Sequence, residues 1–222
     1  MYDFDQARRE MVDCQIRTAD VTNYSILKAF SRVAREKFVP DGASSIAYCE
    51  TNIHLGEDRY LLEPRIFAKM LELLKVNSND LILDIGCGFG YSSAIISEMA
   101  ELVISLEEEF FFKSAQKLLL EASADNTIVY EGKLSEGINY QEKVDALIIQ
   151  GGVQTIPLKI KNQLKNGGRL VAIFINGFKG ECRIGIKKEN QIHWNHGFDA
   201  YVPLLKNFSK NEEFIFWKKL WI

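Results

Sequence analysis

The sequence predicts an α/β protein with a doubly wound, mostly parallel sheet and a helical extension at its N-terminus. From residue 80 onward, short continuous apolar runs alternate with segments that carry apolar residues at helical spacing. Continuous apolar runs are typical of parallel strands that are covered by helices on both faces. The first run leads into a glycine-rich turn and then a helix start, and this order implies right-handed βαβ crossovers.

Three helices are expected before residue 80. The first covers residues 5–16, where apolar positions recur near one face, and the second covers residues 24–35 with Asn23 as its N-cap. The third begins at Pro64, since proline is favoured in the first turn of a helix. The stretch 44–62 shows no clear periodicity and is expected to be irregular.

Strands and helices are then expected to alternate. The strands are predicted at 81–85, 102–106, 127–130, 144–149 and 169–175, and the helices at 92–100, 110–122 and 157–164. The apolar, aromatic end at 214–222 is expected to add closing strands. We expect residues 1–78 to form the helical and active-site covering segment and residues 79–222 to form the cofactor-binding domain, together in one compact unit.

The composition is typical of a soluble globular protein rather than a membrane or nucleic-acid-binding protein. The 222 residues carry a net charge of −3, so no basic surface for nucleic acid is expected. No apolar run approaches the roughly 18 residues that span a bilayer, and the charged N-terminus does not resemble a secretory signal. The four cysteines (Cys14, Cys49, Cys87 and Cys182) form no CxxC pair, which favours reduced thiols and a cytoplasmic location.

The glycine-rich turn is the strongest functional signal. Gly86, Gly88 and Gly90 follow the strand 81–85, and glycines allow the backbone to approach a ligand closely. Asp84, which immediately precedes the turn, would repel a pyrophosphate and attract an ammonium group. The turn therefore favours S-adenosylmethionine as the cofactor. A tight turn without a ligand is the alternative.

A second acidic residue stands at the end of the next predicted strand. Glu107 follows Asp84 by 23 residues. A carboxylate in this position of a βαβ unit can accept hydrogen bonds from both hydroxyl groups of a ribose. The two acids together predict a nucleoside cofactor at the carboxyl edge of the sheet.

These features occur with several longer segments that resemble one family. The segments are VAREKFVP (33–40), Ala47-Tyr48, LLEPRIFAKMLELL (61–74), LILDIGCGFGYSSAII (81–96), VISLEE (103–108), VDALII (144–149) and IPLKIKNQLKNGGRLV (156–171). The chain resembles class I S-adenosylmethionine-dependent methyltransferases with a Rossmann-like fold. It resembles the protein-L-isoaspartate O-methyltransferase family most closely, from about residue 11 to residue 171.

The resemblance implies a set of cofactor-binding residues. They are Asp84, Gly86, Cys87, Gly88, Gly90, Glu107, Glu108, Lys133, Leu134 and Gln150. Asp84 would face the ammonium group, the glycine turn would wrap the methionine part and Glu107 would bind the ribose. Glu108, Lys133 and Leu134 would lie near the adenine. Gln150 would lie at the end of the fourth strand, where substrates meet the sheet.

Two segments depart from the family pattern. The covering segment, which commonly reads like TISQP, is here the run 60–64, and its characteristic hydroxyl is replaced by Leu62. By position, the candidate catalytic residues are Leu62, Tyr60 and Glu63, and the last two could act as a base for a substrate of high pKa. Arg59 or Arg65 could meet a substrate carboxylate. The Gly-Asp pair that usually follows the third strand is here Gly-Lys, at 132–133.

The resemblance implies repair of damaged proteins by methylation of the isoaspartyl carboxylate. A carboxylate is ionised at neutral pH, since its reference pKa is about 4, and so needs no general base. The expected partners are an isoaspartyl protein or peptide, or a small carboxylate. Because of Leu62, the alternative is a cofactor-binding homologue with a different substrate or a non-catalytic sensing role. No metal is expected, and the oligomeric state is not defined, although we favour a monomer.

Overall fold

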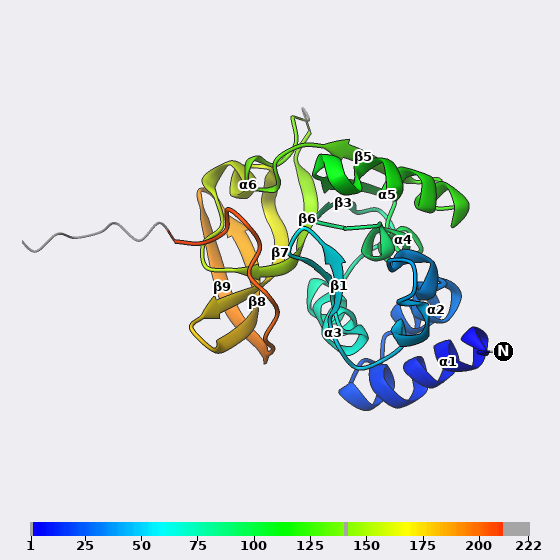
Figure 1. The fold of residues 1–222 in the computed structure, drawn as a ribbon. Coiled ribbons are helices and arrows are strands. Elements are labelled where there is room, and N and C mark those ends of the chain that lie inside the picture. Colours follow the sequence, from blue (N-terminus) through cyan, green and yellow to red (C-terminus); the bar gives the residue numbers. More distant parts are fainter. Residues whose placement is uncertain (1, 140–141, 211–222) are drawn as a thin grey trace, which may run out of the picture.

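The computed structural model describes residues 2–139 and 142–210. Within these residues the main sheet has seven strands in the order β5-β4-β3-β6-β7-β8-β9 (Figure 1). The strands are β3 (Leu81–Ile85), β4 (Leu102–Glu107), β5 (Thr127–Glu131), β6 (Val144–Val153), β7 (Leu164–Asn176), β8 (Lys179–Lys188) and β9 (Gln191–Asp199). The helices that alternate with them are α4 (Tyr91–Ser97), α5 (Glu109–Glu121) and α6 (Leu158–Asn162).

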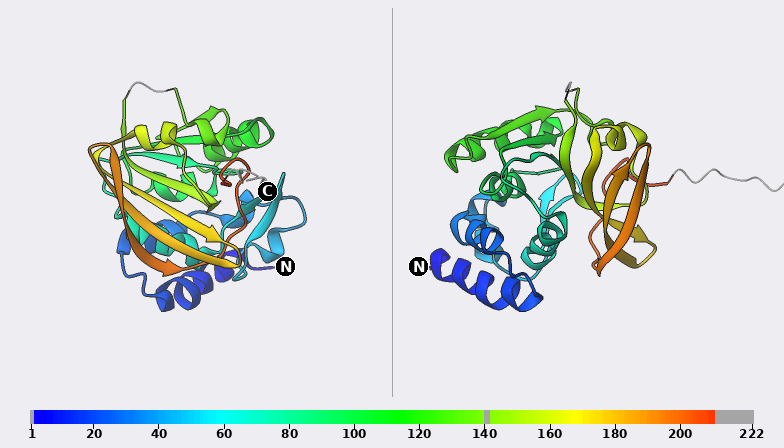
Figure 2. Two further views of the ribbon diagram at one scale, coloured as in Figure 1. Left: turned by 90° about the vertical axis from the view of Figure 1, so that its left-hand side faces the viewer. Right: turned by 180° about the vertical axis from the view of Figure 1, so that it is seen from behind.

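The strand directions confirm the predicted doubly wound, mostly parallel sheet. Strands β5, β4, β3, β6 and β7 pair in parallel, whereas β8 and β9 are antiparallel additions at one edge (Figure 2). Alternate side chains of one strand enter different cores. Ile82 belongs to the core that contains α2, α3 and α4, and Leu83 belongs to the core beneath α6. A central strand such as β3 is therefore mostly apolar on both of its faces, as the sequence pattern indicates.

The N-terminal helices pack on the same face as α4. They are α1 (Phe4–Glu10), α2 (Tyr24–Arg32) and α3 (Pro64–Leu74). The predicted caps are confirmed: the Asn23 side chain accepts a hydrogen bond from the backbone of Ser25, and Pro64 is the first residue of α3. The predicted first helix is α-helical only to Glu10 and continues as a π-helix over Met11–Ile16.

A β-hairpin lies within the stretch that was expected to be irregular, so that expectation was wrong for its later part. Strand β1 (Ile53–Gly56) pairs with β2 (Arg59–Leu61). The two turn residues, Glu57 and Asp58, have φ angles of 48° and 56°. Non-glycine residues in this left-handed region cost about 1–3 kcal/mol each, so the turn is strained. In Figure 1 the hairpin stands between α3 and the centre of the sheet.

The antiparallel strands β8 and β9 were not predicted. The segment expected to supply closing strands, 214–222, lies outside the described residues. No helix of residues 2–139 and 142–210 has the length and apolar character that crossing a membrane requires.

One buried arginine holds the base of the loop that carries the hairpin. Arg35 is 0% exposed. Its guanidinium donates to the carbonyl oxygen of Ala47 at 2.7 Å and to that of Leu62 at 2.6 Å, and it lies 4.8 Å from the ring centroid of Tyr91. The two ends of the loop are therefore tied to one side chain.

We expect the change Arg35→Ala to lower the free energy of unfolding by about 3 kcal/mol or more. The variant leaves two buried carbonyl groups without a donor, and each such group costs about 1–3 kcal/mol. Urea unfolding measures the loss. The control is Arg32→Ala, whose ion pair with Glu98 is solvent-exposed, and we expect a loss of less than about 1 kcal/mol. Equal losses in both variants would contradict this role of Arg35.

Candidate active site

The turn between β3 and α4 has the backbone shape that its glycines predict. The φ angles are 83° at Gly86, 59° at Gly88 and 101° at Gly90. Residues with a side chain rarely adopt these angles, and glycine adopts them without strain. The turn brings its backbone N–H groups to the carboxyl end of β3, beside the end of β4.

Asp84 lies at the end of β3 and is fully buried. The hydroxyl groups of Ser92 and Ser93 donate to its Oδ2 at 2.6 and 2.7 Å, and the amide of Gln150 donates to its Oδ1 at 2.8 Å. These three donors are neutral. Burial consequently raises the pKa of Asp84 above its ordinary value, although the hydrogen bonds oppose the shift.

Glu107 lies at the end of β4, is also fully buried, and has a cationic partner. Arg59 of the hairpin donates from Nη1 to Oε1 at 2.7 Å and from Nη2 to Oε2 at 2.8 Å. The backbone N–H of Gly88 donates to Oε2 at 2.6 Å, and that of Glu108 donates to Oε1 at 2.8 Å. Two carboxylate oxygens offer about four acceptor positions, so these four donors fill them.

The hairpin also fills the space above the glycine turn. A Cβ atom built on Gly86 would lie 2.7 Å from Nη2 of Arg59, and one built on Gly88 would lie 2.6 Å from Cδ1 of Leu55. The remaining cavity has a volume of about 10 Å³, about the space that one water molecule needs. Its lining residues are Tyr60, Leu61, Leu62, Phe67, Gly86, Cys87, Tyr91, Ser92 and Gln150.

Several predicted site residues lie together around this small cavity. Tyr60, Leu62, Cys87 and Gln150 line it, and Asp84 contacts it through Gln150. The side chain of Leu62 is buried, whereas Tyr60 is partly exposed and its ring lies 5.1 Å from that of His54. Burial raises the pKa of the Cys87 thiol well above its ordinary value, so this cysteine is protonated at neutral pH.

Other predicted residues lie outside the cavity. The carboxylate of Glu63 accepts a hydrogen bond from Arg65 at 2.8 Å, so these two side chains pair with each other. Lys133 is exposed, while the neighbouring Leu134 is buried and faces Gly86. Glu108 takes part through its backbone N–H, as the residue before α5.

Sequence reasoning missed the pairing of Arg59 with Glu107. Arg59 was considered only as a partner for a substrate carboxylate, yet it is 4% exposed at the side chain and holds an acid 48 positions away. The sequence gives little signal for this pairing, because the hairpin turn at 57–58 has none of the glycine or asparagine that usually marks such a turn.

The polar groups suit a nucleoside cofactor, but the space in this conformation does not fit one. Positive-φ glycines, a carboxylate at each strand end and the Gly88 N–H are the groups that such a ligand requires. Arg59 and Leu55 lie against the glycine turn, and the cavity that remains there measures about 10 Å³, far less than a nucleoside needs.

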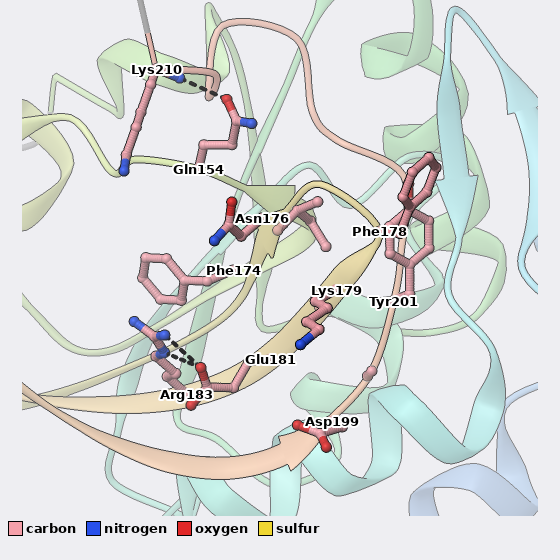
Figure 3. Close-up of a pocket in the computed structure, with 13 residues that line it drawn as sticks. Gln154, Phe174, Asn176, Phe178, Lys179, Glu181, Arg183, Asp199, Tyr201 and Lys210 are labelled. Carbon is pink, nitrogen blue, oxygen red and sulfur yellow. Dashed lines mark hydrogen bonds and ion pairs between the residues drawn. The ribbon is translucent and has the colours of Figure 1, made fainter.

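A much larger cavity lies elsewhere in the described part of the chain. It measures about 850 Å³ and is lined by residues of β7, β8 and the segment 199–201 (Figure 3). Figure 3 shows Arg183 paired with Glu181 at one side and Lys210 hydrogen-bonded to Gln154 at another. It contains none of the predicted site residues, so we do not assign the activity to it. Within the described chain, no cluster of three or more His, Cys, Asp or Glu side chains could hold a metal.

We expect Arg59 and Glu107 to behave as one energetic unit. Each single change, Arg59→Met or Glu107→Gln, removes the charge-assisted hydrogen bonds of the other side chain and should cost about 1.5–3 kcal/mol of unfolding free energy. The double variant should cost at least 1 kcal/mol less than the sum of the two single losses. Urea unfolding of the four proteins measures this coupling.

The matched control is the exposed pair of Arg17 and Asp13, whose side chains are 55% and 65% exposed. Its coupling should be below about 0.5 kcal/mol. A coupling at Arg59 and Glu107 as small as this would show that the buried pair contributes little to the fold.

Comparison with known proteins identifies the family. The model of the family "Protein-L-isoaspartate(D-aspartate) O-methyltransferase (PCMT)" matches residues 6–208. A protein-L-isoaspartate O-methyltransferase from Petrotoga mobilis is 32% identical over 171 residues, which cover 76% of this chain and 80% of the relative. Protein-L-isoaspartate O-methyltransferase 2 from Shewanella sediminis is 32% identical over 202 residues, which cover 90% of this chain and 83% of the relative.

Solved structures show the same fold. A protein-L-isoaspartate O-methyltransferase matches with a TM-score of 0.79 and 21% identity, over 91% of this chain and 67% of that chain. A protein from Plasmodium falciparum, assigned to the same enzyme, was solved in complex with S-adenosyl-L-homocysteine. It matches with a TM-score of 0.76 and 16% identity, over 93% of this chain and 99% of that chain. Members of this family are S-adenosylmethionine-dependent methyltransferases, and the comparisons do not favour a non-catalytic role. This chain belongs to the protein-L-isoaspartate O-methyltransferase family.

Proposed function

We propose that this chain transfers the methyl group of S-adenosylmethionine to the carboxylate of isoaspartyl residues in damaged proteins or peptides. The family match over residues 6–208 carries the proposal, since it includes both acids and the glycine turn between them. Asp84 and Glu107, at the ends of adjacent parallel strands, are the residues to which we assign the cofactor's ammonium and ribose groups.

The substrate side of the site is assigned to the residues that follow the hairpin. The sulfonium cofactor already carries an activated methyl group when bound, so the protein has to align the substrate and exclude water. Leu62, Phe67 and Tyr91 give the small cavity an apolar lining, which suits water exclusion. We assign no general base, because an isoaspartyl carboxylate is ionised at neutral pH.

Two further properties belong to this proposal. We propose a cytoplasmic location, which is supported by four free cysteines within the described chain. We also propose that the active form is a monomer.

The proposed activity is tested by transfer of tritiated methyl groups to an isoaspartyl peptide. We expect a base-labile methyl ester on this peptide and none on the same peptide with ordinary aspartate, since only the isoaspartyl carboxylate is the substrate. No incorporation, despite clear cofactor binding by calorimetry, would contradict the repair function.

The variant Leu62→Ser restores the hydroxyl that is common in the family at this position. If the natural chain is active, the variant should change KM more than kcat, because the hydroxyl would contact bound substrate rather than the methyl group. Activity in the variant alone would show that the natural chain is not a repair enzyme.

A further inference from the structure

We propose that the β1–β2 hairpin is a lid over the cofactor site, and that its Arg59 occupies on Glu107 the position of the cofactor's ribose. The cofactor then enters by displacing Arg59 rather than by filling an open crevice. The proposal rests on the proposed function, since it takes S-adenosylmethionine as the ligand.

The first argument is the count of hydrogen-bond positions on Glu107. Arg59 supplies two of the four donors, and the backbone N–H groups of Gly88 and Glu108 supply the others. The backbone donors belong to the turn and to the start of α5, and they can remain in place when a ligand binds. The two positions that a ribose diol needs are those that Arg59 holds.

The second argument is steric. The side chains of Arg59 and Leu55 come from the two strands of one hairpin, and they cover Gly86 and Gly88 respectively. Both glycines therefore become accessible if the hairpin moves as a unit. Movement of Arg59 alone would leave Leu55 over Gly88, so the lid has to include both strands.

The third argument is the strain within the hairpin and its anchoring at the two ends of the loop. It is short, its register is irregular between His54 and Gly56, and its turn holds two non-glycine residues at positive φ. Strained turns of this kind are typical of switch regions and ligand clamps. Arg35 holds both ends of the loop at Ala47 and Leu62, so the neck of the loop can stay in place while the hairpin moves. Opening then uncovers only the part of the core that Ile53, Leu55 and Leu61 of the hairpin fill.

The fourth argument is that the closed state leaves Arg59 incompletely satisfied. Its Nε is buried and has no hydrogen-bond partner. The guanidinium lies 5.5 Å from the ring centroid of Phe111, which offers a weaker contact than a hydrogen bond. Displacement into solvent would give this donor a partner. The closed pair is thus a competitor that a ligand of the right shape can replace.

Because only open molecules bind the cofactor, the apparent dissociation constant equals the intrinsic constant divided by the fraction of molecules that are open. If about 90% of molecules are closed, removing Arg59 lowers the dissociation constant about tenfold. Isothermal titration with S-adenosylhomocysteine measures this constant without any catalytic turnover. We expect Arg59→Ala to bind about tenfold more tightly than the natural chain, and Arg59→Lys to bind more tightly by a smaller factor.

The matched control is Arg169→Ala. Arg169 also pairs with a buried acid, Asp80, but this pair lies at the opposite end of the strands, before β3 begins. The dissociation constant of the Arg169→Ala variant for S-adenosylhomocysteine should stay within about twofold of the natural value, even if the variant is less stable. If Arg59→Ala does not fold, Arg59→Lys decides the question, because it keeps the positive charge and loses only the paired geometry.

An unchanged constant in the Arg59 variants would overturn the lid. Weaker binding would overturn it as well, because Arg59 would then contact the cofactor directly. The methyl-transfer assay tests the proposed function separately from the lid. Tighter binding without methylation of the isoaspartyl peptide supports the lid and refutes the repair activity, whereas methylation with unchanged binding does the reverse.

Discussion

The need to compensate two buried carboxylates organises this part of the molecule. Asp84 and Glu107 end neighbouring strands, and neither side chain is exposed. An ionised group away from water is costly unless donors surround it. Neutral donors from α4 and β6 meet the first acid, whereas a guanidinium from a distant hairpin meets the second. Because Glu107 pairs with Arg59, the hairpin lies over the glycine turn and closes the crevice.

The fold could be predicted where periodicity carries the information. The β3-turn-α4 unit at 81–97 and the start of α3 at Pro64 follow from apolar runs, glycines and a proline, all of which act locally. The hairpin at 53–61 could not be predicted in the same way, since its strands are only four and three residues long. Strands β8 and β9 are half-exposed additions at a sheet edge, and tertiary pairing rather than local pattern defines them.

The site residues that the sheet carries could be predicted from the sequence, whereas those that the hairpin contributes could not. Glu107 is recognisable because its distance from the glycine turn is a property of the βαβ unit. Its partner, Arg59, comes from outside that unit, and no spacing rule relates the two. Glu63 was named as a possible base for a similar reason: the sequence places it next to the site, but only the structure shows its pairing with Arg65.

The hold of Arg35 on Ala47 and Leu62 makes the intervening segment an Ω-loop that is fastened at its neck by a single guanidinium. Between these anchors, Ile53, Leu55 and Leu61 also pack in the core, whereas the turn at 57–58 is exposed. Insertions at this turn are therefore the form of sequence drift that the scaffold can absorb most cheaply.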